Sequence, residues 1–142
     1  MRIDDETHRL EAIEKAVVRL REEARGSLVV VEGGRDKQAL EALGVPGHHF
    51  AVNRGVALEV LMDQVVQVVH AERLRKVVLL TDWDRTGGRL FARLRDGLRA
   101  RVGLETEVRR LLATLCHVRT FEEVPAELAS LRHRLGHPGR PV

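Results

Sequence analysis

Two short, uninterrupted apolar runs constrain the fold of this chain more than any other feature. They are "LVVVE" at 28–32 and "KVVLL" at 76–80, and turn-forming residues lie close to both. A strand with one face in solvent alternates apolar and polar residues, whereas a strand buried on both faces is apolar throughout. The two runs therefore predict central strands of a sheet that helices cover on both faces.

The segments between these runs carry the spacing of amphipathic helices, with apolar residues every three or four positions. We expect helices at 4–25, 35–44, 56–73, 87–101, 105–115 and 125–135, and weaker strands at 49–53 and 117–120. Pro125 suits the first turn of the last helix, where a proline is tolerated. Strands that alternate with helices predict an α/β fold with about four parallel strands and helices on both faces.

The length of 142 residues suits one domain. We expect an N-terminal helix within 1–25 that packs on a core at 26–122. A C-terminal helix and a frayed tail follow at 123–142.

Cysteine content and hydropathy indicate the compartment. The single cysteine, Cys116, excludes a disulfide within the chain and fits a reducing environment. No apolar run reaches the roughly 18 residues of a membrane-spanning helix, and the N-terminus "MRIDDETHRLE" is too polar for a signal peptide. We therefore expect a cytoplasmic protein with no membrane partner.

The basic residues are mostly arginines, since Lys15, Lys37 and Lys76 are the only lysines, and the net charge is +3. Arginine suits two-point contact with phosphate groups. A base bias in the genome would produce the same composition, so composition alone leaves the choice open.

Acidic residues follow both central runs. Glu32 ends the first run and precedes "GGRD", and the second run leads into "TDWDRTGG" with Asp82 and Asp84. Carboxyl ends of parallel strands meet at one edge of a sheet, and side chains two apart on an extended segment point the same way. The three acids would therefore converge if the strands are neighbours. Since like charges oppose each other's ionisation, a divalent cation such as Mg²⁺, which prefers oxygen ligands, would relieve the repulsion.

Glycines follow both groups of acids, as Gly33–Gly34 and Gly87–Gly88. Such pairs permit sharp turns and close approach of a ligand, and each pair precedes a helix whose N-terminus favours anions. Thr86 is a candidate cap for the second helix. A single acid at a strand end is commonly just a helix cap, so the prediction of a site depends on the joint occurrence.

These residues resemble a known family. "VVVEGGRD" and "VVLLTDWDRTG" resemble the two signatures of the Toprim domain, which are hydrophobic strand–Glu–Gly and hydrophobic strand–Asp-x-Asp-x-x-Gly. Topoisomerases, bacterial primases, certain nucleases and recombination-associated proteins share this domain. The segment "NRGVALEVLMDQVVQV" is also similar to the corresponding segment of Toprim nucleases that mature small ribosomal RNA. The resemblance covers about residues 26–122.

The resemblance implies a compact, Rossmann-like sheet and a set of roles. Glu32 would match the family's glutamate, a general acid/base and in some members a metal ligand, and Asp82 and Asp84 would match the pair that holds Mg²⁺, which Mn²⁺ can replace. Gly33 and Gly87 would match the turn glycines. Asp36 falls where several members carry a further acid.

The chain departs from the larger Toprim proteins. It has no tyrosine, so it lacks the nucleophile that a topoisomerase needs. One cysteine supplies no regular zinc-ligand set, and no G-x-x-x-x-G-K motif marks an ATPase part. What remains resembles a nearly bare Toprim domain.

Basic residues near the acids are candidates for contact with a nucleic-acid backbone. They are Arg35, Lys37, Arg54, Arg85 and Arg89, with Arg93 one turn beyond Arg89. A solvated helix face is the alternative for the arginines that recur every four residues. Trp83 should point away from the aspartates and pack, by alternation.

We expect a Mg²⁺ site that acts on phosphodiester bonds of DNA or RNA. Cleavage is favoured over synthesis because nothing resembles a nucleotide-selecting apparatus. One alternative is a non-catalytic nucleic-acid-binding module, or a subunit whose site a protein partner completes. Another is a haloacid-dehalogenase-type phosphatase with Asp82 as nucleophile and Asp84 as acid/base. That family needs a downstream lysine, and none follows Lys76.

Overall fold

The computed structural model describes residues 3–136, and its centre is one sheet of four parallel strands in the order β2-β1-β3-β4. The strands are β1 (Leu28–Val31), β2 (His48–Ala51), β3 (Val77–Leu79) and β4 (Leu104–Glu105). All residues of β1 and β3 are buried, as the two apolar runs predict. The expected α/β class with about four parallel strands is confirmed.

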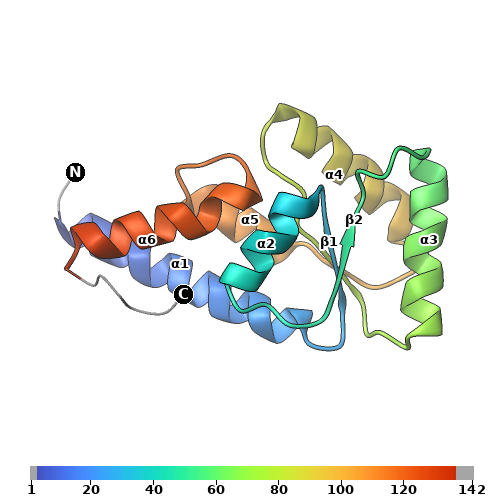
Figure 1. The fold of residues 1–142 in the computed structure, drawn as a ribbon, viewed down its shortest axis with the longest axis horizontal. Coiled ribbons are helices and arrows are strands. Elements are labelled where there is room, and N and C mark those ends of the chain that lie inside the picture. The colour runs from blue at the N-terminus through green and yellow to red at the C-terminus, as the bar shows by residue number, and fades with distance from the viewer. Residues whose placement is uncertain (1–2, 137–142) are drawn as a thin grey trace.

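Helices cover both faces of the sheet (Figure 1). One face packs against α1 (Ile3–Ala24), α2 (Gly34–Ala42), α5 (Glu107–Leu115), η1 (Phe121–Glu123) and α6 (Val124–Arg134). The other face packs against α3 (Leu58–Ala71) and α4 (Arg85–Leu98). Alternate residues of β1 divide between the two cores, with Val29 facing the first and Val30 the second. Within residues 3–136, no helix combines the length and apolarity needed to cross a membrane.

The strand order creates a crevice at one place on the sheet edge. The chain leaves β1 through α2 and moves to β2 on one side, whereas it leaves β3 through α4 and moves to β4 on the other. These two connections also lie on opposite faces of the sheet. Ligands of open α/β sheets bind at such a switch point, outside the carboxyl ends of the strands.

Pairing of β1 with β3 sets the register at this crevice. Val30 lies opposite Leu79, and the ladder continues as Leu80 N–H donates to Val30 O at 2.8 Å. Glu32 follows directly after β1, and Asp82 follows shortly after β3. The register therefore brings the two acids to neighbouring positions, as the sequence predicts if these strands are neighbours.

One predicted strand is wrong. Residues 117–120 form a loop, and the short strand Leu104–Glu105 occupies the position beside β3 instead. The hydrogen bonds of the loop go elsewhere, because the main chain of Trp83 donates to Arg119 O at 3.0 Å and its indole Nε1 donates to Val118 O at 2.7 Å. Trp83 is thus a partly buried packing residue, as expected.

The helix boundaries differ from the predictions at a few ends. Helix α4 begins at Arg85 rather than at 87, and α3 is shorter than 56–73. Helix α6 begins at Val124, and Pro125 lies in its first turn, as predicted. The predicted frayed tail falls mostly at 137–142, outside the described residues.

Candidate functional site

Glu32 and Asp82 form a hydrogen-bonded pair at the switch point. The main-chain N–H of Asp82 donates to Glu32 Oε2 at 2.7 Å, across 50 positions of sequence. The negative charge of Glu32 disfavours ionisation of the neighbouring Asp82 carboxyl group.

The surroundings of Asp82 favour the protonated form of its carboxyl group. Burial raises the pKa of Asp82 to about 7, and the charges of Glu32, Asp36 and Asp84 add to the effect. Phe121 N–H donates to Asp82 Oδ1 at 2.8 Å and opposes the shift. Burial also raises the pKa of Glu32, and the hydrogen bond from Asp82 N–H opposes that change. Asp82 therefore holds its proton more tightly than an exposed aspartate does.

Asp84 lies beside this pair and caps α4. Its Oδ1 accepts a hydrogen bond from Gly87 N–H at 2.7 Å. The prediction that Thr86 caps this helix is wrong, because the helix begins at Arg85 and places Thr86 in its first turn. The charge of Asp84 still raises the pKa of both Glu32 and Asp82. The structure thus brings the three predicted acids together, although β3 ends before them at Leu79.

Asp36 is buried beneath the loop that follows β1, with 5% of its surface exposed. Its Oδ2 accepts hydrogen bonds from Glu32 N–H at 3.1 Å and from Gly33 N–H at 2.9 Å. These bonds hold the main chain of Glu32 at the N-terminus of α2. Asp36 therefore orders the site from below and does not project into solvent.

Among the glycines predicted at the site, Gly87 has a specific steric role. A Cβ at this position would lie 2.2 Å from Asp82 O, so a larger residue would push the two segments apart. The chain bends at Glu32 and Gly33, but Gly33 has a φ of −150°, which is ordinary extended backbone, so this bend does not require a glycine there. Gly34 and Gly88 lie in helices, and a Cβ at either would meet open space.

Arg109 of α5 supports the acidic loop from the opposite side. Its Nε donates to Thr81 O and its Nη2 donates to Asp82 O, both at 2.7 Å. The guanidinium carbon lies 4.0 Å from the centroid of the Phe91 ring. Burial lowers the pKa of Arg109 while the three acids raise it, and an arginine keeps its charge under such conditions. The guanidinium group of Arg109 thus holds the main chain at Thr81 and Asp82 in position.

The predicted basic residues lie around the edge of the site. Arg35, Arg54, Arg85, Arg89 and Arg93 are exposed, and Lys37 is partly buried. Arg54 lies 3.9 Å from the centroid of the Phe50 ring, and Arg93 lies 4.0 Å from Glu59. Within residues 3–136, Arg85 and Arg89 have no hydrogen-bond or ion-pair partner, so both are available to a ligand.

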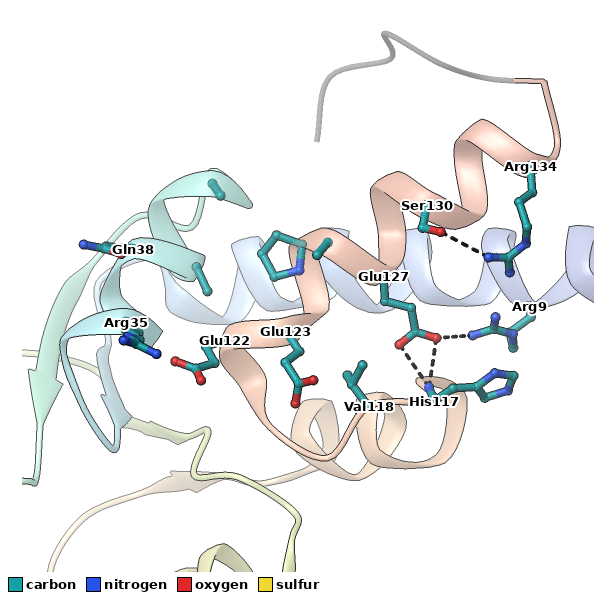
Figure 2. A pocket seen from close by; sticks show the side chains of 14 residues that line it. Arg9, Arg35, Gln38, His117, Val118, Glu122, Glu123, Glu127, Ser130 and Arg134 are labelled. Carbon is teal, nitrogen blue, oxygen red and sulfur yellow. Dashed lines mark hydrogen bonds and ion pairs between the residues drawn. The ribbon is translucent and has the colours of Figure 1, made fainter.

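Two cavities lie near this edge. One, of about 350 Å³, is lined by Glu32, Gly33, Val52, Asn53, Leu61 and Leu90. The other, of about 780 Å³, lies between α2, the loop after α5 and α6 (Figure 2). In the larger cavity Glu127 already accepts hydrogen bonds from Arg9 Nη1 at 2.6 Å and from His117 N–H at 2.9 Å (Figure 2). The smaller cavity is the one that adjoins the candidate site, because Glu32 forms part of its wall.

Comparison with known proteins gives the family. A UPF0292 protein of Methanosarcina barkeri is 31% identical over 134 residues, which cover 91% of this chain and 89% of the relative. The chain belongs to the UPF0292 family. A UPF0292 protein of Methanocaldococcus jannaschii is 35% identical over 70% of this chain and 72% of its own length. No protein-family model matches the sequence.

A solved structure has the same fold as this UPF0292 chain. A protein of Aquifex aeolicus superposes with a TM-score of 0.65 over 77% of this chain and 94% of its own. The two sequences are 22% identical. The match supports the arrangement of strands and helices that forms the switch point.

Sequence reasoning missed two parts of the candidate site, namely Arg109 and the loop that donates Phe121 N–H to Asp82. Nothing in the sequence distinguishes Arg109 from Arg110, which forms an exposed pair with Glu107. The loop was interpreted as a strand. A main-chain donor leaves no signature in the sequence, because any residue except proline supplies it.

Carboxylate oxygens are the ligands that a hard cation prefers, but these side chains are not arranged around a metal position. Within the described part of the chain, no group of three or more His, Cys, Asp or Glu side chains is arranged to hold a metal ion. Main-chain N–H groups bind one oxygen each of Glu32, Asp82 and Asp84. Each carboxyl group has two oxygens, so one oxygen of each remains beyond these main-chain bonds.

Proposed function

We propose that this edge of the sheet is a Toprim-type magnesium site and that the protein cleaves phosphodiester bonds in DNA or RNA. The observation that carries the proposal is the Glu32–Asp82 pair, which is joined by a hydrogen bond across the sheet edge and has raised pKa values beside Asp84. Acids with raised pKa values in a crevice are characteristic of functional sites. This crevice also lies where open α/β sheets bind their ligands.

The acids divide into two roles under this proposal. Asp82 and Asp84 would hold Mg²⁺, or Mn²⁺ in its place, and Glu32 lies close enough to share it. The bound ion would stabilise the negative charge that develops on the phosphate as the bond breaks. Arg109 keeps the loop of Asp82 in position through two carbonyl groups and leaves the carboxylates available to the ion.

Glu32 is suited to move a proton. Burial raises its pKa from the ordinary value toward neutral pH, where a general acid or base works best. Its side chain is oriented by Asp82 N–H, and its main chain is held by Asp36. The group that transfers the proton is therefore fixed from two directions.

Exposed arginines at the start of α4 would bind the substrate backbone. Arg85 and Arg89 are one turn apart on the helix that Asp84 caps, and neither has a partner within residues 3–136. Contacts of arginine with phosphates position a nucleic acid without reading its sequence. Binding through these residues should weaken as the salt concentration rises.

A second candidate is a binding module that does not cleave. The observation in its favour is that no metal-binding group is preassembled among residues 3–136. The Glu32–Asp82 hydrogen bond would then be a structural contact, and a protein partner would complete any reaction.

A nuclease assay separates the two candidates. Labelled single-stranded DNA, duplex DNA and structured RNA are incubated with Mg²⁺, Mn²⁺ or chelator and with wild type, Glu32→Gln or Glu41→Gln. Glu41 is exposed on α2 and makes the matched control. We expect metal-dependent cleavage that falls at least about a hundredfold in Glu32→Gln alone. Full activity of this variant would overturn the mechanism, and binding without cleavage would favour the binding module.

A further inference from the structure

The cavity beside Glu32 has walls of two kinds. It lies between the ends of β1 and β2 and the N-terminal halves of α3 and α4, with a volume of about 350 Å³. Val52, Leu61 and Leu90 supply aliphatic walls, while Glu32 and Asn53 supply the polar side chains. Its volume falls at the lower end of the range of about 300–1,000 Å³ for small-molecule pockets. It suits a single small ring system rather than an extended molecule.

The charges of the cavity select against a phosphate. No cationic side chain lines it, and the carboxyl group of Glu32 forms part of its wall. An anion would be repelled there and would lose its hydration without compensation. An uncharged group with an apolar surface and several hydrogen-bonding atoms fits better.

Asn53 offers hydrogen bonds at a fixed position. Its main-chain N–H donates to Glu32 O at 2.9 Å, which ties it to the loop of the candidate site. No hydrogen bond engages its side-chain amide within the described residues. An amide provides both donors and an acceptor, which is the combination that the edge of a nucleobase requires.

Cations lie next to the cavity in the chain but outside it. Arg54 follows Asn53 and Arg89 precedes Leu90, and both arginines are exposed. This arrangement places positive charge where the phosphates of a bound strand would run and leaves the interior to a neutral group. The charge pattern therefore matches one nucleotide whose base points inward and whose backbone stays outside.

We propose that this cavity binds one unpaired nucleobase and that the substrate is a single-stranded nucleic acid or an unpaired segment of one. The proposal rests on the proposed function and specifies its substrate class. A base inside a duplex cannot reach a closed pocket unless it leaves its partner and its stack. The base would pack between the side chains of Leu61 and Leu90, with Asn53 at its edge. The Trp83 indole is not available for stacking, since it packs in the core and donates to Val118 O.

Cleavage of single strands with and without one base tests the pocket. The substrates are an oligonucleotide with a single cleavage site, the same strand with an abasic residue at each position next to that site in turn, and the corresponding duplex. DNA and RNA versions are compared. We expect at least about tenfold slower cleavage for the duplex and for one of the abasic strands, the size typical for the loss of one stacked base.

Substitutions of residues that line the cavity test whether the preference for the intact strand arises there. Leu90→Phe fills the space, Asn53→Ala removes the amide from an exposed position, and Leu115→Phe is the control on the opposite face of the sheet. In both cavity variants the rate ratio between the intact strand and the sensitive abasic strand should fall toward one. The control should keep the ratio of the wild type. Equal cleavage of intact and abasic strands by the wild type, or an unchanged ratio in both cavity variants, would overturn the proposal.

A binding measurement keeps this proposal distinct from the catalytic one. A strand that carries 2-aminopurine is titrated with protein in chelator, where no cleavage occurs, and the fluorescence of the unstacked base is recorded. A saturable change that Leu90→Phe abolishes would support the pocket even if no substrate is ever cut. Absence of binding to every strand would overturn the pocket, and binding without any cleavage would overturn the catalytic proposal alone.

Discussion

Charged residues around α6 and those at the carboxyl edge of the sheet are organised in opposite ways. Around α6, acids pair with arginines across helices that are distant in sequence. The pairs are Arg9–Glu127 at 2.6 Å, Arg132–Glu14 at 2.8 Å and Arg134–Glu6 at 2.7 Å. At the sheet edge, Glu32, Asp82 and Asp84 face one another instead. Arg109 lies beside them but donates to the main-chain carbonyls of Thr81 and Asp82.

The pKa values follow this difference. The hydrogen bond from Arg134 lowers the pKa of Glu6, whereas burial raises the pKa of Asp82 to about 7. A fold that pairs its acids in one region can leave them unpaired in another only at a cost in stability. The comparison teaches that the acids around α6 are compensated by cations, whereas those at the sheet edge are held by main-chain N–H groups.

The largest loss of stability should come from breaking an ion pair around α6. Arg132→Ala leaves Glu14 without its arginine at a site where Arg132 is 7% exposed. Breaking a buried ion pair costs about 3 kcal/mol or more, so urea unfolding should show a loss of that size at pH 7. The loss should not depend on Mg²⁺. A loss below about 1 kcal/mol would contradict a stabilising role for this pair.

Arg109→Ala should cause the next largest loss in the free energy of unfolding. It removes two hydrogen bonds to carbonyls and the contact with the Phe91 ring, and we expect a loss of about 2 kcal/mol in the free energy of unfolding. Arg110→Ala is the matched control, because its pair with Glu107 is exposed and its loss should change the free energy of unfolding little. Equal effects of the two variants would show that Arg109 is only a surface residue.

Asp82→Asn should increase the free energy of unfolding instead of lowering it. In chelator the folded protein keeps the Asp82 proton up to about pH 7, whereas the unfolded chain releases it near 3.8. The free energy of unfolding of the wild type therefore falls as the pH rises between these values.

At pH 8 the variant should be more stable by about 1–2 kcal/mol, allowing for solvent screening of a partly exposed group. Mg²⁺ at ten times its Kd should restore about 1.4 kcal/mol to the wild type and nothing to the variant. Asp96→Asn, at an exposed acid of α4, serves as control. A wild type whose stability rises between pH 4 and 7 in chelator would refute the raised pKa.

Arg134→Ala should have the smallest effect. Its pair with Glu6 is exposed, with 49% of the Arg134 side chain accessible, and such pairs contribute little to stability. Thermal unfolding in low and high salt measures it, since screening should remove most of the difference. A loss as large as that of Arg132→Ala would mean that burial does not set the value of the pairs around α6.

Much of the fold could be predicted because its signals are local. Leu28–Val31 and Val77–Leu79 are apolar throughout, which requires cover on both faces, and the helices carry their own period. The segment 117–120 was misread because a short run with apolar and polar residues suits a strand or a loop equally. Its outcome depends on whether the sheet offers a free edge, and Leu104–Glu105 takes that edge.

The sequence alone determined which acids follow the two central strands, and parallel strands must bring such residues to one edge. It could not determine that Glu32 accepts a hydrogen bond from Asp82 N–H, that Asp36 is buried, or that Arg109 rather than Arg110 holds the loop. Those facts depend on distances of a few ångströms between segments far apart in the chain. Only the packed fold sets such distances, because burial and neighbouring charges are properties of a place and not of a residue type.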